Sequence, residues 1–334
     1  MPETRPRRVA ISGLGSIARQ HVAAFAALGG VEIVAFDPST PLREEALAGG
    51  RVSRAVADFD ELLDLEPTAL VVAAPDFAHL DQLSRATARG IPVLVEKPLA
   101  VDFAAAASVI DEIEGRGVPV LVGYVLRHRR VVETVRRLVL ESAIGVPGSF
   151  QVMLGAYGTI TAAASRFATP EPNRVYRDYS HEWDYLRWIF GPIREVTAVA
   201  RTLDAMPHVE SPNLVDGLLV LESGVSGAVH VDYVEPRGTR TLHIVGSEGA
   251  LFADIGRGTI ALRRGGEVFD RAFDLAEPAS VPLGRQAAHL LAVASGAEQP
   301  RVGLRDGLAA LAVTDALIRS AADRSWVAVP GEAS

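Results

Sequence analysis

The stretch VAISGLGSIARQH at residues 9–21 decides the fold, because an apolar strand pattern runs directly into a glycine-rich turn and a helix start. Gly13 allows the tight turn, Gly15 lets backbone amides approach a pyrophosphate, and Ala18 keeps the helix close to its strand. The positive end of the helix then favours the phosphate charge. The stretch therefore predicts a dinucleotide-binding turn, with cofactor contacts at Gly13, Gly15, Ser16 and Ile17.

A second apolar run, VEIVAF at 31–36, ends at Asp37, close to the position where an acidic side chain binds the ribose hydroxyls of NAD. A carboxylate there repels a 2′-phosphate, so we expect NAD, while Ser39 and Arg43 leave NADP possible. The alternative interpretation makes Asp37 a turn residue before Pro38.

Length and charge limit the class of protein. A chain of 334 residues is too long for one ordinary core, which favours two packed domains. The net charge of −8 argues against a nucleic-acid partner. With no cysteine, the chain has no disulfide, thiolate zinc site or cysteine nucleophile.

The chain shows no signal for export or membrane insertion. Its first residues, MPETRPRR, lead into a strand without the apolar segment of a signal peptide. No apolar run reaches the length that spans a bilayer. We therefore expect a cytoplasmic protein with no membrane partner.

The first third of the chain alternates short apolar runs with helical segments, which predicts a doubly wound parallel sheet of the Rossmann type over 1–124. From 125 to 334 the runs become longer and more alternating, which indicates an α/β domain with a large, mostly antiparallel open sheet. Helical patterns return at 285–296 and 304–324. The apolar runs of the first domain are VAIS at 9–12, VEIVAF at 31–36, ALVVAAP at 69–75, PVLVEKP at 92–98 and PVLVGY at 119–124.

Polar residues follow the third and fourth of these runs. Pro75 and His79 lie where a loop would close over the cofactor, although they equally suit loop punctuation and a helix start. Glu96, Lys97 and Pro98 place two charges at the end of an apolar strand, which indicates a cleft because a buried sheet does not admit charge readily. All three are candidate cofactor contacts. The Lys97–Pro98 bond is a candidate cis peptide, and a surface lysine before a turn is the alternative.

A helix is expected over DYSHEWDYLRWIFG at 178–191, ending at Gly191. Its spacing places His181, Asp184 and Tyr185 on one face. A helical histidine is by itself more often structural than catalytic. His181, Glu182 and Asp184 cannot give three ligands to one ion from a single helix, so we expect no metal.

Together these motifs resemble the Gfo/Idh/MocA oxidoreductases, a family named for glucose-fructose oxidoreductase and inositol dehydrogenase. The resemblance covers nearly the whole chain, and the order and spacing of the motifs make it specific. The motifs are GLGSIA at 13–18, the loop from Pro75 to His79, EKP at 96–98, GYVLRH at 123–128, SHEWD at 180–184, GSEGALFAD at 246–254 and DGLAALAVTDALIRSA at 306–321.

The resemblance implies an NAD(P)-dependent enzyme that acts on sugars, cyclitols or related polar carbonyl compounds. In such enzymes the lysine of EKP contacts substrate and cofactor, and a histidine on a helix of the second domain acts as acid or base. Those roles would fall on Lys97 and His181, and the sequence leaves open which of the two transfers the proton, because a desolvated lysine can lose its charge. The segment after the fifth strand, with Tyr124 and Arg127, would line the substrate pocket.

Two departures from the family pattern concern the catalytic set. Many members have an aspartate four residues before the helical histidine, where this chain has Arg177, while Asp178 lies three residues before it. A glycine-rich stretch is replaced by PEPNRVYR at 170–177. Asp178 is a third catalytic candidate, and Arg177 and Tyr157 are candidate substrate-binding residues.

We expect reversible hydride transfer between nicotinamide and a secondary alcohol or ketone of a sugar, sugar derivative or cyclitol. One alternative keeps NAD bound and uses transient oxidation for elimination, isomerisation or glycosidic cleavage. A second is a sensor that binds cofactor without catalysis. The apolar face of the second sheet favours a homo-oligomer, and the resemblance implies a homodimer or homotetramer.

Overall fold

The computed structural model describes residues 7–158, 172–203, 212–264 and 269–331. These residues form two compact units, one from 1–128 with 278–308 and the other from 129–277 with 309–334. Within the described residues, no helix combines the length and the apolar character needed to cross a membrane.

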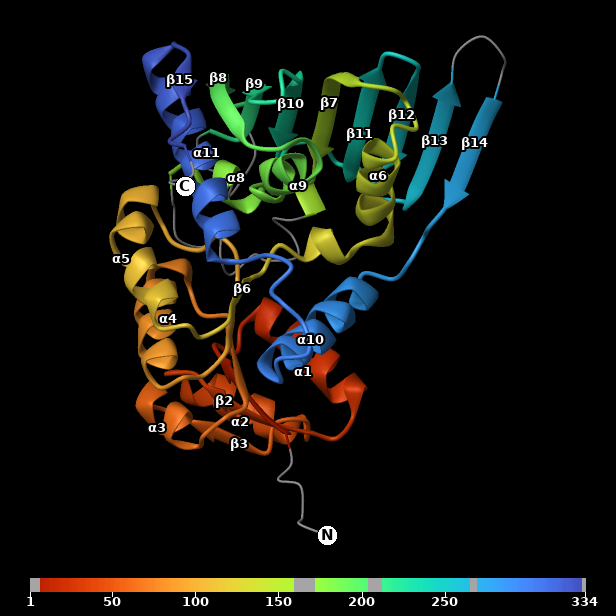
Figure 1. Cartoon of the computed structure of the whole chain (residues 1–334). Coiled ribbons are helices and arrows are strands. Elements are labelled where there is room, and N and C mark those ends of the chain that lie inside the picture. The colour runs from red at the N-terminus through yellow and green to blue at the C-terminus, as the bar shows by residue number, and fades with distance from the viewer. Residues whose placement is uncertain (1–6, 159–171, 204–211, 265–268, 332–334) are drawn as a thin grey trace. The chain divides into compact units, whose positions relative to one another are not determined.

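The first unit contains a six-stranded parallel sheet with the order β3-β2-β1-β4-β5-β6, drawn in red to yellow in Figure 1. The order reverses between β1 and β4, which is where a doubly wound sheet binds its ligand. The predicted Rossmann fold is confirmed. Its strands are β1 (Arg7–Ser12), β2 (Val31–Phe36), β3 (Arg54–Val56), β4 (Ala69–Val72), β5 (Val93–Val95) and β6 (Val120–Val122).

Short helices connect these strands. Two of them have aspartate N-caps, since Asp58 accepts the amides of Asp60 and Glu61, and Asp102 accepts that of Ala105. The helical segments are α1 (Ser16–Leu28), α2 (Thr40–Ala48), α3 (Phe59–Asp64), η1 (Asp76–Ala78), α4 (His79–Ala88), α5 (Phe103–Gly115) and η2 (Val125–His128).

Helix α10 (Ser280–Ala294) returns from late in the chain to the first unit and packs against α1, as Figure 1 shows. Its apolar face joins the core formed by β1, β4 and α1. The sequence boundary at 124/125 groups α10 with the second domain, whereas the contacts of 278–308 lie in the first unit. The buried residues contributed by α10 are Leu283, Ala287, Leu290 and Val293.

The second unit contains a nine-stranded sheet with the order β14-β13-β12-β11-β7-β10-β9-β8-β15. Only β7 and β10 pair in parallel; every other neighbouring pair within this sheet is antiparallel, as expected from the alternating sequence. The strands are β7 (Pro147–Gly155), β8 (Ile193–Arg201), β9 (Leu214–Leu221), β10 (Ser226–Asp232), β11 (Thr239–Gly246), β12 (Gly249–Asp254), β13 (Thr259–Arg264), β14 (Phe269–Asp274) and β15 (Val327–Ala328).

One face of this sheet, the inner face, is covered by helices. Phe190 stacks on Phe150 of β7 with ring centroids 5.6 Å apart. Trp183 Nε1 donates to Thr314 Oγ1 at 2.9 Å, and the amide of Ala198 in β8 donates to Ser320 Oγ at 2.9 Å. The helices of this unit are α6 (Arg130–Leu140), α8 (Arg174–Asp178), α9 (His181–Phe190) and most of α11 (Leu304–Asp323).

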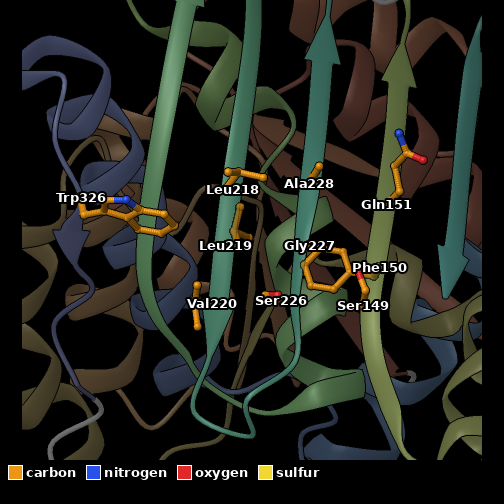
Figure 2. Close-up of a pocket in the computed structure, with 10 residues that line it drawn as sticks. All are labelled: Ser149, Phe150, Gln151, Leu218, Leu219, Val220, Ser226, Gly227, Ala228 and Trp326. Carbon is orange, nitrogen blue, oxygen red and sulfur yellow. The ribbon is translucent and has the colours of Figure 1, made fainter. Parts of the chain in front are cut away.

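The opposite face, the outer face, carries apolar side chains in solvent. Figure 2 shows Leu218, Ala228 and Gln151 side by side on neighbouring strands, with the Trp326 ring at one edge of a shallow depression. Leu218 is 49% exposed, whereas its neighbour Leu219 on the inner face is 0% exposed. The large apolar residues exposed on or beside the outer face are Met153, Val199, Leu218, Val245, Phe252 and Trp326.

Candidate functional site

Gly13 occupies a position that only glycine fits. Its φ is +89°, and a Cβ there would lie 2.6 Å from the carbonyl oxygen of Ala73. Its amide donates to the carbonyl of Phe36 at 2.8 Å. The turn between β1 and α1 is therefore held tightly against β2 and β4.

Helix α1 begins without a side-chain cap. Its N-cap is Gly15, and a Cβ at Gly15 would meet no atom within 4 Å. The amides of the first turn, from Ser16 and Ile17 onward, are left for another acceptor, in contrast to the capped helices α3 and α5. Uncapped amides, open space and the positive end of a helix fit the pyrophosphate of a dinucleotide.

Asp37 lies directly after β2, and backbone amides hold its carboxylate. Oδ2 accepts the amide of Leu14 at 2.9 Å and Oδ1 accepts that of Ser39 at 2.8 Å. Each oxygen keeps a further lone pair, so the carboxylate can still accept two ribose hydroxyls. Arg43 is turned onto the carbonyl of Asp37 itself, at 2.7 Å.

His79, the first residue of α4, joins two loops at this edge of the sheet. Its Nδ1 lies 2.8 Å from the carbonyl oxygen of Pro98, and its Nε2 lies 2.9 Å from that of Ala74. The side chain is 1% exposed. Asp76 begins the short helix η1 between β4 and α4, with Pro75 as its N-cap, so His79 ties this loop to the one after β5.

Glu96 is buried beside Lys97. Its Oε1 lies 2.7 Å from Nε2 of His21 in α1, and its Oε2 accepts the amide of Lys97 at 3.2 Å. Burial raises the pKa of Glu96, but the hydrogen bond and charge of His21, with the Lys97 ammonium, outweigh it and hold the pKa below its usual value. A Cβ at Gly123 would lie 2.8 Å from Glu96 Oε2, so Gly123 makes room for this carboxylate.

Lys97 is half-buried, and its peptide bond to Pro98 is cis. It is also the only lysine among the 33 lysines and arginines of the chain. An arginine side chain stays protonated, whereas a lysine ammonium is a compact charge that can lose its proton when desolvated. The one position that uses an ammonium is thus the position where the sequence predicts a catalytic group.

Tyr124 and Arg127, two predicted substrate contacts, are buried in the first unit. Tyr124 is 0% exposed, and Arg127 is 2% exposed with Nη2 2.8 Å from Asp306 Oδ1. Arg127 Nη1 also donates to the carbonyl of Arg301 at 3.3 Å. These contacts join η2 to the start of α11, which favours a packing role for Arg127.

His181 and Asp178 lie on two helices, where a single helix was expected. The chain leaves α8 at Asp178, passes through Tyr179 and Ser180, and begins α9 at His181. Helix α9 ends at Gly191 as predicted, with φ +94°. His181 is half-buried, whereas Asp184 and Tyr185 are fully buried, so only His181 of the predicted face keeps contact with solvent.

Tyr233 is a candidate functional residue that the sequence reading missed. Its hydroxyl donates to Asp178 Oδ2 at 2.7 Å, and its ring lies 5.1 Å from that of Tyr179. Tyr233 directly follows β10, one residue after Asp232, whose Oδ1 accepts the amides of Val234 and Glu235. An aromatic residue at the end of an alternating strand was the available signal.

The remaining polar candidates belong to the same unit as His181. Arg177 is 8% exposed, and Nη2 contacts the carbonyl of Pro172 at 3.5 Å. The amide of Tyr157 donates to the carbonyl of Glu235 at 3.0 Å. Glu182, next to His181, is fully buried, with Oε1 3.0 Å from Nε of Arg240 in β11.

The glycine turn, the uncapped helix and the carboxylate after β2 define a dinucleotide-binding fold. Residues 7–124 match a family model described as "Oxidoreductase family, NAD-binding Rossmann fold", and residues 132–252 match the "GFO/IDH/MocA C-terminal domain". The chain therefore belongs to the GFO/IDH/MocA oxidoreductase family. The predicted resemblance is confirmed.

Relatives span most of the chain. It is 27% identical over 330 residues to D-apiose dehydrogenase of Paraburkholderia graminis, covering 93% of this chain and 87% of the relative. It is 24% identical over 335 residues to inositol 2-dehydrogenase of Rhizobium meliloti, covering 96% and 99%. A solved levoglucosan dehydrogenase with NADH superposes with a TM-score of 0.86 at 19% identity, covering 97% of this chain and 99% of the other.

Membership in this family confirms the expected class of enzyme and the expected cofactor. The protein is an oxidoreductase of the dehydrogenase type, and NAD is its cofactor. The residues that would hold NAD are those whose geometry fits it, namely Gly13, Gly15, Ser16, Ile17 and Asp37.

Proposed function

We propose that this enzyme transfers hydride reversibly between NAD and a secondary alcohol carbon of a sugar, sugar derivative or cyclitol. Bound NAD supplies the hydride acceptor in the oxidising direction. The observation that carries the proposal is the lone lysine of the chain, placed after β5 beside the buried carboxylate of Glu96. The relatives named as inositol and apiose dehydrogenases support the substrate class.

Lys97 donates a hydrogen bond to the reacting oxygen and stabilises the negative charge that develops there as hydride leaves. A fixed cation is effective in this role because it needs no reorganisation during the reaction. Glu96 is ionised, and its charge favours the ammonium form of Lys97. The local electrostatics therefore support an electrostatic role for Lys97.

His181 accepts the hydroxyl proton. A histidine suits this step because its ordinary pKa lies near neutral pH, so the ring both accepts and returns a proton. Its position at the start of α9, half-buried beside fully buried Glu182, holds the ring at the edge of the helix layer. Asp178, fixed by Tyr233, assists at the same site.

Polar substrates need several hydrogen-bonding partners. We assign substrate hydroxyls to Arg177 and Tyr157, which lie in the same unit as His181 and Asp178. The tyrosine hydroxyl both donates and accepts, and the arginine fork suits paired oxygens. Both choices favour a hydroxylated substrate over an apolar one.

The test is NADH formation by the wild type and by Lys97→Ala and Lys97→Arg, with inositols, pentoses and hexoses as substrates. We expect Lys97→Ala to lower kcat by about 10²- to 10⁴-fold, with NADH affinity within a few-fold of the wild type. Lys97→Arg keeps the charge but changes its shape, and should recover only part of the rate. Full turnover by Lys97→Ala would show that the assignment of Lys97 is wrong.

We also propose that a second copy of the chain covers the outer face of the nine-stranded sheet. Exposed apolar patches of this kind mark interaction surfaces in folded proteins. Leu218 lines the depression in Figure 2, with Trp326 at its edge. A homodimer or homotetramer is expected by sedimentation, and Leu218→Glu should dissociate it into smaller species. A monomeric wild type would contradict this proposal.

A further inference from the structure

Two buried histidines hold the residues on either side of Lys97. His21, in α1, contacts the carboxylate of Glu96, the residue before Lys97. His79, in α4, contacts the carbonyl of Pro98, the residue after it. Both are almost completely buried, at 0% and 1% exposed. The two helices approach the segment from different parts of the sequence.

Only one of the two ring nitrogens of His21 has a hydrogen-bond partner among the described residues. Nε2 lies 2.7 Å from Glu96 Oε1, while Nδ1 is buried without a hydrogen-bond partner among the described residues. Leaving Nδ1 without a partner costs free energy, which the bond from Nε2 must offset. Glu96 in turn restrains the backbone of Lys97, because its other oxygen accepts the backbone amide of Lys97.

Both ring nitrogens of His79 contact a backbone carbonyl. Nδ1 faces the carbonyl of Pro98 and Nε2 faces the carbonyl of Ala74, at 2.8 and 2.9 Å. Both carbonyls are acceptors, so only a ring protonated on both nitrogens donates to both. The Nδ1 contact is the one that restrains the segment of Lys97, while the Nε2 contact restrains the loop after β4.

We propose that His21 and His79 are positioning residues that fix the backbone on both sides of Lys97, and so fix where its ammonium lies. Neither histidine is assigned a proton-transfer step. The inference rests on the proposed function of Lys97, and extends it to two residues in helices α1 and α4. A displacement of about 1 Å at a reacting group can cost 10²-fold in rate, which gives such restraints their importance.

Substitution by asparagine or by glutamine tests the two ring nitrogens of histidine one at a time. The amide nitrogen of glutamine reaches the place of histidine Nε2, and that of asparagine the place of Nδ1. His21→Gln therefore keeps the donor to Glu96 and His21→Asn loses it. At the other position the pattern reverses, since His79→Asn keeps the donor to Pro98 and His79→Gln loses it.

We expect kcat to follow this reversal. His21→Gln and His79→Asn should retain most of the turnover, while His21→Asn and His79→Gln lose about 10-fold or more. A generic packing role predicts the same preference, for asparagine or for glutamine, at both positions. The same order at both positions would therefore overturn the proposal.

A second readout does not depend on turnover. Because Lys97 is the only lysine, an amine-acylating reagent modifies only its side chain and the N-terminal amine, and mass spectrometry resolves the two. The N-terminal amine serves as the internal reference. The acylation rate of Lys97 should change by about threefold or more in His21→Asn and His79→Gln, and should stay near wild type in the other pair.

A matched control removes the effect of simple destabilisation. His289, in α10, is a buried histidine whose ring nitrogens contact Glu298 and Arg301 instead of the segment around Lys97. His289→Asn should lower the urea midpoint without changing the acylation rate of Lys97. Unchanged acylation rates in all four variants at 21 and 79 would refute the positioning role whatever the activities are.

The two proposals fail in different ways. If Lys97→Ala keeps full turnover while the acylation rates follow the expected pattern, the catalytic assignment of Lys97 is wrong and the positioning role stands. If Lys97→Ala is inactive and the acylation rates do not follow the pattern, the catalytic assignment stands and the positioning role is wrong.

Discussion

The two sheets of this protein differ in where polar and apolar side chains lie along their strands. The parallel sheet of the first unit has fully buried strands, such as β4 and β5, and the candidate site residues Asp37 and Lys97 come after the strands end. The sheet of the second unit alternates, so that β9 has Leu219 at 0% and Leu218 at 49% exposed. A polar residue of the candidate site is therefore easy to recognise in the sequence of the first unit. In the second unit it is one of many polar residues that alternate with apolar ones.

The largest effect should separate the two faces of the second sheet. Leu219→Ala removes a buried side chain from the inner face and should lower the free energy of unfolding by about 3–4 kcal/mol. Leu218→Ala, one residue away, should change it by less than about 0.5 kcal/mol at a concentration where the chain is monomeric. Urea unfolding measures both. Equal costs would break the distinction between the faces.

In the first unit the corresponding contrast lies between two glycines. Gly13→Ala combines a positive φ with a close approach to Ala73, and should cost roughly 3 kcal/mol and abolish NADH binding. Gly15→Ala meets nothing within 4 Å, so unfolding should change little. Its effect should appear in NADH affinity alone, measured by fluorescence titration. A large unfolding cost at Gly15 would contradict the separation.

Two buried tyrosines test the site of the second unit. Tyr233→Phe removes a donor from the buried carboxylate of Asp178, and should cost about 1–2 kcal/mol and lower kcat. Tyr185→Phe is the matched control, because its buried hydroxyl has no hydrogen-bond partner among the described residues. It should unfold at the same or a slightly higher urea concentration. If Tyr185→Phe lowered the stability more than Tyr233→Phe did, the role given to Tyr233 would be wrong.

The smallest effect concerns two histidines with opposite pKa shifts. In the first unit, burial and neighbouring arginines lower the pKa of His128 to about 3. In the second, hydrogen bonds to Asp232 and Asp216 raise the pKa of His230 to about 9 despite partial burial. The two units should therefore respond to pH in opposite directions.

The signs follow from which state binds the proton more tightly. Below pH 6.5 the unfolded chain protonates at His128 while the folded chain does not until about pH 3, so stability is lost as pH falls across that window. His230 contributes fully below pH 6.5, and its contribution is lost as pH rises through about 9. His128→Leu should flatten the acid side of the stability profile, and His230→Asn should flatten the alkaline side. Urea midpoints from pH 4 to 10 would show this, and parallel profiles would contradict it.

Sequence patterns predicted the type of each sheet, because uninterrupted apolar runs and strict alternation are each tied to burial. The three-residue strand β3 was missed because RAV is too short to show a pattern. The break between α8 and α9 was also missed, since Tyr179 and Ser180 carry no helix-stopping signal.

The residues of the candidate site were predictable only where a charged side chain interrupts or ends an apolar run. Glu96 and Lys97 interrupt an apolar strand, and Asp37 ends one. His21 and Tyr233 lie within regular patterns and acquire their significance from partners distant in sequence, Glu96 and Asp178. No local pattern reports such pairings. The catalytic roles of Lys97, His181 and Asp178 stay predictions until the variants are measured.

Helix α10 has a consequence for synthesis of the chain. Leu283, Ala287, Leu290 and Val293 complete the core around α1, although about 150 residues of the second unit are translated before them. N-terminal domains usually fold first as the chain leaves the ribosome. Here the dinucleotide-binding unit begins first and finishes late, because its core stays open until residue 294 has emerged. A fragment that ends at residue 128 would expose that core and should aggregate, whereas expressing residues 278–308 alongside it should improve its recovery.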